Sequence, residues 1–526
     1  MEDTSLPRSL PLALLTLLLV TLFSTCAAQG DDPRRIGARA QTSAPSSTAP
    51  DRELRAVWMA SVLNIDYPSS PTPSAATLQA DFRSQLYRLR QAGINTLYVQ
   101  VRPAGDALYP SALAPWSEYL TGRQGKAPTD GFDPLAYIIE TAHARGVEVH
   151  AWVNPYRVAM NTDSVARHPK HLLSTHPEWI HTYGGRQYLD PGLPAVRAHL
   201  GKVIDELVAN YDLDGVHFDD YFYPYPKAGE DFPDSLTFRQ YGGSMARDYW
   251  RRENVNTFVA ETHRRIKAAK PWVQFGVSPF GVWRNRAQDP ARGSDTRAGA
   301  TSYDDLHADA LQWARAGTVD YLAPQLYWSM DYPAASHRTL ANWWAQNTPA
   351  TVNLYFGHAA YKVRDNADAA WNDLQEIPHQ IAYTRQLPAV GGSAFFSARS
   401  IFNSRNGLAP ELAKVYARPA LHPERLAPTP VVGVRVKTFK PKATEEGQLI
   451  IWEVDKKLPE ENLPHYYAIY RGPKGEAAEM IHRTPFGLNC RRLHYYDKAT
   501  TGKTKLLYRV VPMDRYHRPL VDLVAR

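Results

Sequence analysis

The sequence predicts a (β/α)8 barrel followed by a small C-terminal β-sandwich. Two observations lead to this fold class. From Glu53 to about Leu421, eight short apolar runs alternate with amphipathic stretches of helical length, a pattern typical of a TIM barrel. After about Pro430, strand-like runs follow one another without helices between them. No glycine-rich phosphate turn follows the first run, which disfavours a doubly wound open sheet.

The eight predicted barrel strands are rich in β-branched and aromatic residues. Helix candidates lie between them, and several end on glycine, a common residue just past a helix C-terminus. We expect the barrel to occupy residues 53–425. The strand runs are 55–60, 96–102, 147–154, 215–221, 274–281, 319–328, 351–357 and 391–397.

The C-terminal segment, residues 430–526, contains the strand-like runs VVGVRVKTF, GQLIIWEV, HYYAIYRGP and KLLYRVVPMD. We expect a β-sandwich that resembles a fibronectin type III domain, with Trp452 in its core. Such appendages usually act as spacers or binding modules, so no catalytic role is assigned to it.

The N-terminus has the features of an export signal. Arg8 precedes an apolar stretch, LPLALLTLLLVTLF, that has the length of a signal peptide rather than of a membrane span. Cleavage after Ala28 would remove a signal peptide of residues 1–28. Alternatively, Cys26 could become the lipidated first residue of a lipoprotein, its only contact with a membrane. Either route predicts a cell-envelope or secreted protein, and residues 29–52, rich in Ser, Pro, Ala and Thr, predict a disordered linker.

Composition narrows the function classes. The chain has 526 residues, 44% of them hydrophobic, which is enough for a large core and more than one domain. The net charge is +7, but the basic residues are scattered, so we expect no nucleic-acid partner. Two cysteines, Cys26 and Cys490, exclude a disulfide framework and a cysteine-based metal site. The 30 tyrosines and 13 tryptophans suit sugar rings, although aromatic residues also pack cores.

Polar and aromatic residues collect where the predicted strands end, which is where barrel enzymes place their active sites. Any one of them could be structural, and their collective bias is what indicates a carbohydrate site, because such groups bind sugar hydroxyls and stack on sugar rings. The candidate substrate-binding residues are Asp66, Arg102, Asp106, Asn154, Tyr156, Tyr221, Tyr223, Arg284, Gln325, Tyr327, Trp328 and Tyr361.

The motifs of serine, cysteine and zinc hydrolases are missing from the sequence, which leaves carboxylate chemistry. No GxSxG elbow is present, and neither cysteine follows a predicted strand with a partner. A metal centre is the alternative, since His150, His217, Asp219 and His358 could converge, but HExxH-type zinc motifs are missing. We therefore predict no metal or cofactor. Paired carboxyl groups, as used on glycosidic bonds, remain.

The stretch DGVHFDDYFYPYP supplies such a pair, Asp219 and Asp220. Side chains alternate along a strand, so both cannot point into the barrel mouth while the strand stays regular. The segment DGVHFD resembles the fourth-strand motif of several glycosidase barrels, in which an essential Asp lies four residues after Asp-Gly. This resemblance implies that Asp219, in phase with His217 and Tyr221, points inward and that Asp220 faces the neighbouring loop, unless the strand has already ended. These two aspartates are the predicted catalytic residues.

Six segments carry a family resemblance: ELRAVWMASVLNIDYPS, YVQVRPAGDALYPS, WVNPYRV, YDLDGVHFDDYFYPYP, FGVSPFGVWRN and YLAPQLYW. Over residues 53–420 the chain resembles glycosyl hydrolase-like family ten, exported bacterial proteins that include an enzyme cleaving peptide-free peptidoglycan strands. The resemblance implies a (β/α)8 hydrolase acting on a β-linked amino-sugar polymer, with the fourth-strand acids at its centre.

One departure from better-known glycosidase barrels leaves the second acid open. The usual glutamate at the end of the fourth or seventh strand is missing, so the partner must be Asp220, Asp331, Asp66 or Asp106. Cleavage assisted by the substrate's N-acetyl group would reduce the need for a protein nucleophile. In that scheme Asp219 and Tyr327 orient the acetamido group and Asp220 is the acid. The alternative function is a non-catalytic carbohydrate-binding barrel.

Overall fold

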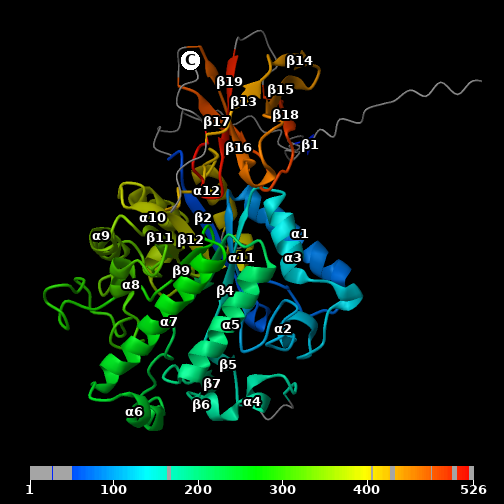
Figure 1. Cartoon of the computed structure of the whole chain (residues 1–526). Helices are drawn as coiled ribbons and strands as arrows, with labels where there is room; N and C mark the ends of the chain where they lie inside the picture. The colour runs from blue at the N-terminus through cyan, green and yellow to red at the C-terminus, as the bar shows by residue number, and fades with distance from the viewer. Residues whose placement is uncertain are drawn as a thin grey trace, which may run out of the picture.

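The structure is a computed structural model that describes residues 26–27, 50–162, 167–403, 407–426, 433–474, 477–499 and 506–520. Residues 1–25 and 28 of the predicted signal peptide, the Cys26 side chain and most of the predicted linker lie outside this described part. Within it, no helix combines the length and apolar character that a membrane crossing requires. Figure 1 shows a large helix-covered body with a smaller strand-rich body at one end.

Eight parallel strands close into a barrel in the order β10-β11-β12-β2-β3-β4-β8-β9, which confirms the predicted (β/α)8 fold. Every predicted run overlaps one strand. Three strands are shorter than predicted because the chain leaves the ladder after Phe218, Val277 and Leu322. The strands are β2 (Leu54–Met59), β3 (Thr96–Arg102), β4 (Glu148–Val153), β8 (Gly215–Phe218), β9 (Gln274–Val277), β10 (Tyr321–Leu322), β11 (Asn353–His358) and β12 (Val390–Phe396).

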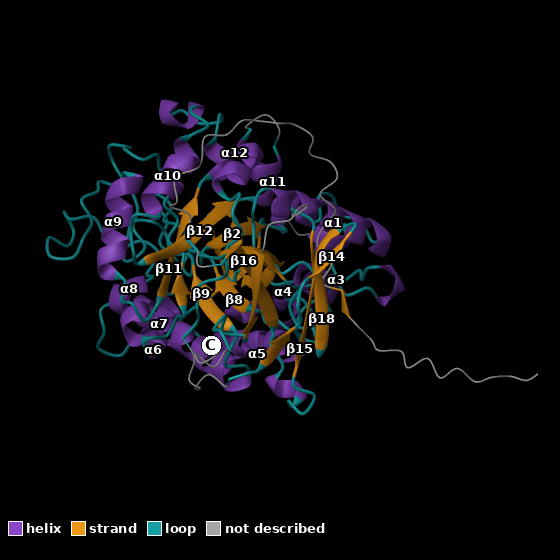
Figure 2. Ribbon diagram, turned by 90° about the horizontal axis from the view of Figure 1, so that it is seen from above, coloured by secondary structure: helices purple, strands orange, loops and turns teal. Residues whose placement is uncertain are grey.

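Helices surround the strands, as the view in Figure 2 shows. Their starts are set by local sequence: Ser74 accepts the N–H of Thr77, and Asp133 accepts the N–H of Leu135. Their apolar faces pack on the outward strand residues in one large core. The main helices are α1 (Ala75–Gln91), α3 (Pro134–His143), α5 (Pro194–Asn210), α7 (Arg247–Ala269), α8 (Ala310–Ala316), α9 (His337–Asn347), α10 (Glu376–Thr384), α11 (Ala398–Phe402) and α12 (Leu408–Val415).

The loops at the C-terminal ends of the strands carry extra elements that the sequence did not predict. A small antiparallel sheet follows β4, in the order β5-β7-β6. These elements enlarge the barrel mouth. They are β5 (Arg157–Ala159), β6 (Ile180–Tyr183), β7 (Arg186–Leu189), and the short helices α2 (Glu118–Thr121), α4 (Leu172–Thr175) and α6 (Ser235–Tyr241).

The barrel interior is filled by aromatic and histidine side chains instead of aliphatic layers. The Trp58 indole N–H donates to Nε2 of His217 (3.0 Å), and the hydroxyl of Tyr321 lies 2.9 Å from Nδ1 of both His217 and His150. Because Nε2 of His217 is an acceptor, its proton sits on Nδ1 and donates to Tyr321. That hydroxyl then donates to His150. Burial holds the pKa of His217 well below its usual value, which favours the neutral form of this ring.

The C-terminal body consists of two antiparallel sheets whose buried faces share one core. Trp452 lies in it, as predicted, with its ring edge-on to Tyr467 (5.4 Å). Strands β17 and β18 were missed because they are half-buried and mix charged with apolar residues, and the three-residue β14 was missed because it is exposed and polar. The fibronectin likeness stays a prediction. One sheet holds β13 (Val436–Thr438), β14 (Lys442–Thr444), β15 (Gly447–Val454), β18 (Arg492–Asp497) and the short β1 (Cys26–Ala27); the other holds β17 (Glu479–Arg483), β16 (Tyr466–Pro473) and β19 (Leu506–Met513).

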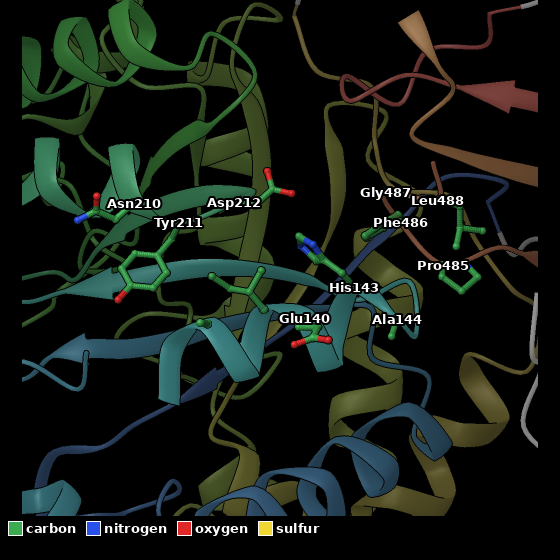
Figure 3. A pocket seen from close by; sticks show the side chains of 12 residues that line it. Glu140, His143, Ala144, Asn210, Tyr211, Asp212, Pro485, Phe486, Gly487 and Leu488 are labelled. Carbon is green, nitrogen blue, oxygen red and sulfur yellow. The ribbon is translucent and has the colours of Figure 1, made fainter. Parts of the chain in front are cut away.

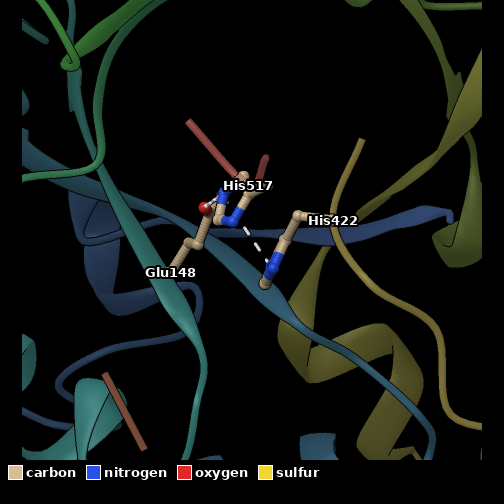
Figure 4. A group of neighbouring side chains, drawn as sticks. All are labelled: Glu148, His422 and His517. Carbon is tan, nitrogen blue, oxygen red and sulfur yellow. Dashed lines mark hydrogen bonds and ion pairs between the residues drawn. The ribbon is translucent and has the colours of Figure 1, made fainter. Parts of the chain in front are cut away.

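The two bodies meet at the N-terminal end of the barrel strands. Glu148, the first residue of β4, is buried there and pairs with the guanidinium of Arg425. His517 of the C-terminal body lies 2.6 Å from the same carboxylate (Figure 4). The burial of this pair makes the junction depend on complementary charge, since an unpaired charge at this depth would be costly.

A metal ion could in principle use Glu148, His422 and His517, the one group of suitable ligands in the described residues. The surroundings do not fit a cation. Nε2 of His422 bonds to the Asn95 carbonyl (3.0 Å), and Arg483 donates to its Nδ1 (2.6 Å). The cluster is therefore an ion-pair and hydrogen-bond joint between the two bodies.

A cleft of about 600 Å³ lies at the same junction (Figure 3). His143 and Asp214 form an ion pair there (2.7 Å), at the end of the barrel away from the C-terminal strand ends. Its position does not fit the active-site location of this fold. The cleft is lined by Ala136, Ile139, Glu140, His143, Ala144, Asn210, Tyr211, Asp212, Pro485, Phe486, Gly487 and Leu488.

Glu148→Gln should destabilise the protein by about 3–5 kcal/mol, because it leaves the Arg425 guanidinium buried without its counter-charge. Thermal unfolding at neutral pH checks this. The neighbouring charges hold the pKa of Glu148 well below 4.5, so its contribution is present above that pH and is lost as the pH falls below it. The matched control is Glu424→Gln, which breaks the half-exposed pair with Arg52 and should change stability by less than about 0.5 kcal/mol.

Candidate active site

Asp219 lies at the barrel mouth, one residue beyond the end of β8, and is half-buried. Asn154 donates to its Oδ2 (3.1 Å), while Gln325 (3.2 Å) and the backbone N–H of Asp220 (2.9 Å) donate to Oδ1. The strand phase thus turns this side chain inward, as predicted. Three N–H donors around the two oxygens suit a negatively charged carboxylate.

The direction of the Asn154 amide is set by its other contacts. Its Oδ1 accepts hydrogen bonds from Gln100 (2.6 Å) and from Arg157 (2.8 Å), which leaves Nδ2 to donate to Asp219. Oε1 of Gln100 in turn accepts two backbone N–H groups of the loop after β2 (2.9 Å each). Gln100 and Arg157 belong to the polar strand-end residues that the sequence places at the barrel mouth, but they are not among the twelve candidate substrate-binding residues.

The carboxyl group of Asp220 has different surroundings from that of Asp219. It is buried, and Tyr225 donates its hydroxyl proton to Oδ2. Burial first, and then the adjacent Asp219 carboxylate, raise the pKa of Asp220 well above the usual value. Burial therefore favours the protonated form of Asp220, whose carboxyl group hydrogen-bonds to Asp219. The two adjacent carboxyl groups thus have different surroundings: three N–H donors at Asp219, and a buried site with a tyrosine hydroxyl at Asp220.

Two rows of aromatic rings border the acid pair. Neighbouring ring centroids within each row are 5.6–6.1 Å apart. Such rows offer flat apolar faces to sugar rings. Phe280, Tyr225 and Phe396 are not among the predicted site residues. The first row is Tyr221, Tyr225, Phe280 and Trp328, and the second is Tyr327, Tyr361 and Phe396.

Asp66 and Asp106, two other predicted site residues, lie in separate buried networks. Asp66 accepts backbone N–H groups of Ala60 (2.7 Å) and Arg399 (2.6 Å) and the Ser397 hydroxyl (2.8 Å), so it ties the first barrel loop to the last. Burial raises the pKa of Asp66 to about 6 and that of Asp106 also to about 6.

Four further predicted residues make their contacts away from the acid pair. Arg102 is fully buried, beside Asp106. The remaining three lie in the helical layer or at its edge: Tyr156 packs on Phe258 (5.3 Å), Tyr223 on His307 (5.1 Å), and Arg284 pairs with Asp304 (2.8 Å). Of the predicted set, the structure gathers Asp219 and Asp220 with Asn154, Tyr221, Gln325, Tyr327, Trp328 and Tyr361.

The histidines considered as metal ligands do not converge. His150 and His217 both bond to Tyr321 inside the barrel, and His358 bonds to Gln380 (2.8 Å) and Ser393 (3.0 Å). Their ring nitrogens are directed to these partners and, for Nε2 of His150, to the Glu148 carboxylate (3.5 Å). The acid pair therefore provides the chemistry that this mouth can perform.

A (β/α)8 barrel whose mouth holds two adjacent carboxyl groups between rows of aromatic rings has the arrangement expected of a hydrolase of glycosidic bonds. Comparison with known proteins agrees. The family model described as "Glycosyl hydrolase-like 10" matches residues 53–373, and the chain belongs to this family. The predicted family resemblance is thereby confirmed, and the protein is a glycoside hydrolase.

The relatives are similar over most of their length. "Glycosyl hydrolase YngK" of Bacillus subtilis is 43% identical over 478 residues, which cover 89% of this chain and 92% of the relative. "Glycosyl hydrolase DigH" of Escherichia coli K12 is 37% identical, over 75% of this chain and 95% of its own. The solved glycoside hydrolase domain of PgaB (BpsB) from Bordetella bronchiseptica aligns at 14% identity and a TM-score of 0.46, covering 69% of this chain and 99% of that one.

Asn154→Ala should lower kcat by about 100-fold, because Asp219 loses a donor whose direction is fixed by Gln100 and Arg157. Stability should fall by only about 1–3 kcal/mol, since two donors lose one acceptor. Steady-state kinetics and thermal melts check both values. Asn342→Ala, which removes an amide bond to the Tyr383 hydroxyl on the outside of the barrel, should leave kcat unchanged. An equal loss of kcat in both variants would contradict the role of Asn154.

Proposed function

We propose that the protein cleaves the glycan strands of peptidoglycan, or a closely related β-linked polymer of N-acetylated amino sugars. In this proposal Asp220 is the general acid and Asp219 is the carboxylate that assists the reacting sugar. The observation that carries it is the pair of adjacent carboxyl groups at the barrel mouth, one held by three N–H donors and the other buried against a tyrosine hydroxyl. The motif resemblance over residues 53–420 supports the substrate class.

The first step is protonation of the leaving group. Asp220 transfers its proton to the glycosidic oxygen as the bond from that oxygen to the anomeric carbon breaks. The burial that raises the pKa of Asp220 favours the protonated form that this step requires. Tyr225, bonded to the other oxygen of the same carboxyl, stabilises the carboxylate that the transfer leaves behind.

The second step forms the intermediate without a protein nucleophile. The carbonyl oxygen of the substrate's acetamido group attacks the anomeric carbon, and the positive charge is shared over a five-membered ring. Asp219 accepts a hydrogen bond from the acetamido N–H on the oxygen that faced the Asp220 proton before its transfer. Tyr327 orients the same acetamido group, and burial raises the pKa of its hydroxyl well above the usual value. Water then opens the ring and returns a proton to Asp220.

The other acids considered as partners support this pairing by their positions. Asp66 and Asp106 are engaged in the buried networks described above. Asp331 is mostly exposed and pairs with Arg338 (3.2 Å) on the outer surface. Asp220 is the acid adjacent to Asp219, and export through the leader-like N-terminus would bring the site to envelope polysaccharides.

Replacement of either central acid tests the function. Asp220→Asn and Asp219→Asn should each lower the rate on peptide-free peptidoglycan glycan strands by about 10²–10⁴-fold, since each removes one proton-transfer or charge-stabilising group. Release of soluble oligosaccharides, followed by chromatography, is the measurement. Asp331→Asn is the matched control and should retain the wild-type rate. Wild-type protein that releases nothing from these strands would refute the proposed substrate.

Tyr225→Phe tests which acid donates the proton. The Tyr225 hydroxyl lowers the pKa of Asp220, so its removal should raise that pKa and move the basic limb of the pH dependence of kcat/KM to higher pH. Tyr361→Phe alters a ring of the second row that makes no bond to the acid, and should leave the limb in place. A limb that is unmoved in Tyr225→Phe would exclude Asp220 as the general acid.

A further inference from the structure

The loop that follows β2 contains a residue in an unfavourable conformation. Leu63 has φ 54° and ψ 20°, the left-handed region, inside the short turn Val62–Asn64. Leucine reaches this region rarely, at a cost of about 1–2 kcal/mol. The next residue, Asn64, is also left-handed (φ 51°), but it belongs to a residue type that tolerates this region.

Leu63 and Asn64 differ in whether their side chains make contacts that compensate for the unfavourable backbone conformation. The Asn64 amide donates to the carbonyls of Pro68 (2.9 Å) and Tyr119 (2.7 Å), which compensates its backbone. The Leu63 side chain has no polar group, and 62% of its surface is exposed. Neither hydrogen bonding nor burial in the core therefore accounts for a leucine at this position, where glycine would be easier to accommodate.

The backbone around Leu63 is held firmly to the candidate active site. The N–H groups of Ser61 and Val62 both donate to Oε1 of Gln100 (2.9 Å each). The same Gln100 side chain donates to Asn154, which in turn donates to Asp219. Leu63 is thus displayed at the barrel mouth, one residue from the hydrogen-bond chain that positions the central carboxylate.

Its neighbours place the loop between two parts of the mouth. Ile65 packs against the interior cluster that includes Trp58. Phe396 of the second aromatic row packs against the same cluster. On the other side, Asn64 is bonded to α2 through Tyr119. An exposed leucine with a strained backbone in this setting points to a contact that is absent from the free protein.

We infer that Leu63 is a specificity-determining residue that packs its side chain on the apolar face of a sugar ring bound at the mouth. This inference rests on the proposed function, since it requires a pyranose polymer as the substrate. The leucine would complement the aromatic rows from the side of the mouth formed by β2 and β3. Its contribution is to binding, while Asp219 and Asp220 perform the chemistry.

Leu63→Gly separates a binding role from a structural one. The substitution removes both the side chain and the backbone strain, so the melting temperature should stay equal or rise. KM on peptide-free glycan strands should increase about five- to tenfold with kcat nearly unchanged, because an apolar contact is lost from bound substrate. Leu63→Met, which restores an apolar side chain, should bring KM back to near the wild-type value.

Asp130→Gly is the matched control. Asp130 has φ 60° inside a similar short turn, Thr129–Gly131, and is exposed. Relief of its strain should leave KM and kcat unchanged. A lower melting temperature in Leu63→Gly, or an unchanged KM, would overturn the binding role of Leu63 and leave the proposed function standing. A wild-type protein inactive on these strands would instead overturn the proposed function, and the contact proposed for Leu63 with it.

Discussion

The fixed direction of one carboxamide governs the active site. Asn154 receives hydrogen bonds on its oxygen from Gln100 and Arg157, so its nitrogen can only donate, and the group beside it must accept. Asp219 is consequently surrounded by N–H groups, while the more deeply buried Asp220 accepts the Tyr225 hydroxyl and has a raised pKa. An apparently symmetric pair of adjacent acids is made unequal by one amide and by the depth of the second carboxyl.

The polar interior of the barrel constrains the orientation of its hydrogen-bonding side chains in a similar way, over a longer distance. Each histidine and tyrosine in the column from His150 to Trp58 must find a partner, because an unpaired polar group at this depth is costly. The column begins close to Glu148, whose carboxylate lies 3.5 Å from His150, and ends beneath the floor of the mouth. The charged joint between the bodies and the floor of the active site are thus connected by one ordered set of side chains.

The fold could be predicted because each barrel strand is a short apolar run whose signal is local. Much of the site could not. A β-bulge between Gln100 and Arg102 shifts the strand phase, so alternation misplaces Arg102, while Tyr156 and Tyr223 lie beyond strand ends where alternation no longer applies. The protonation of Asp220 depends on burial by distant loops. The Glu148 joint depends on His517, 369 positions away, which no sequence window contains.

The pairing of β1 with β18 has a consequence for how the molecule is oriented. Residues 26–27 are paired with the C-terminal body, and that body covers the pole of the barrel opposite the mouth (Figure 1). Any attachment through this segment would therefore hold the enzyme by its base, with the mouth facing away from the point of attachment.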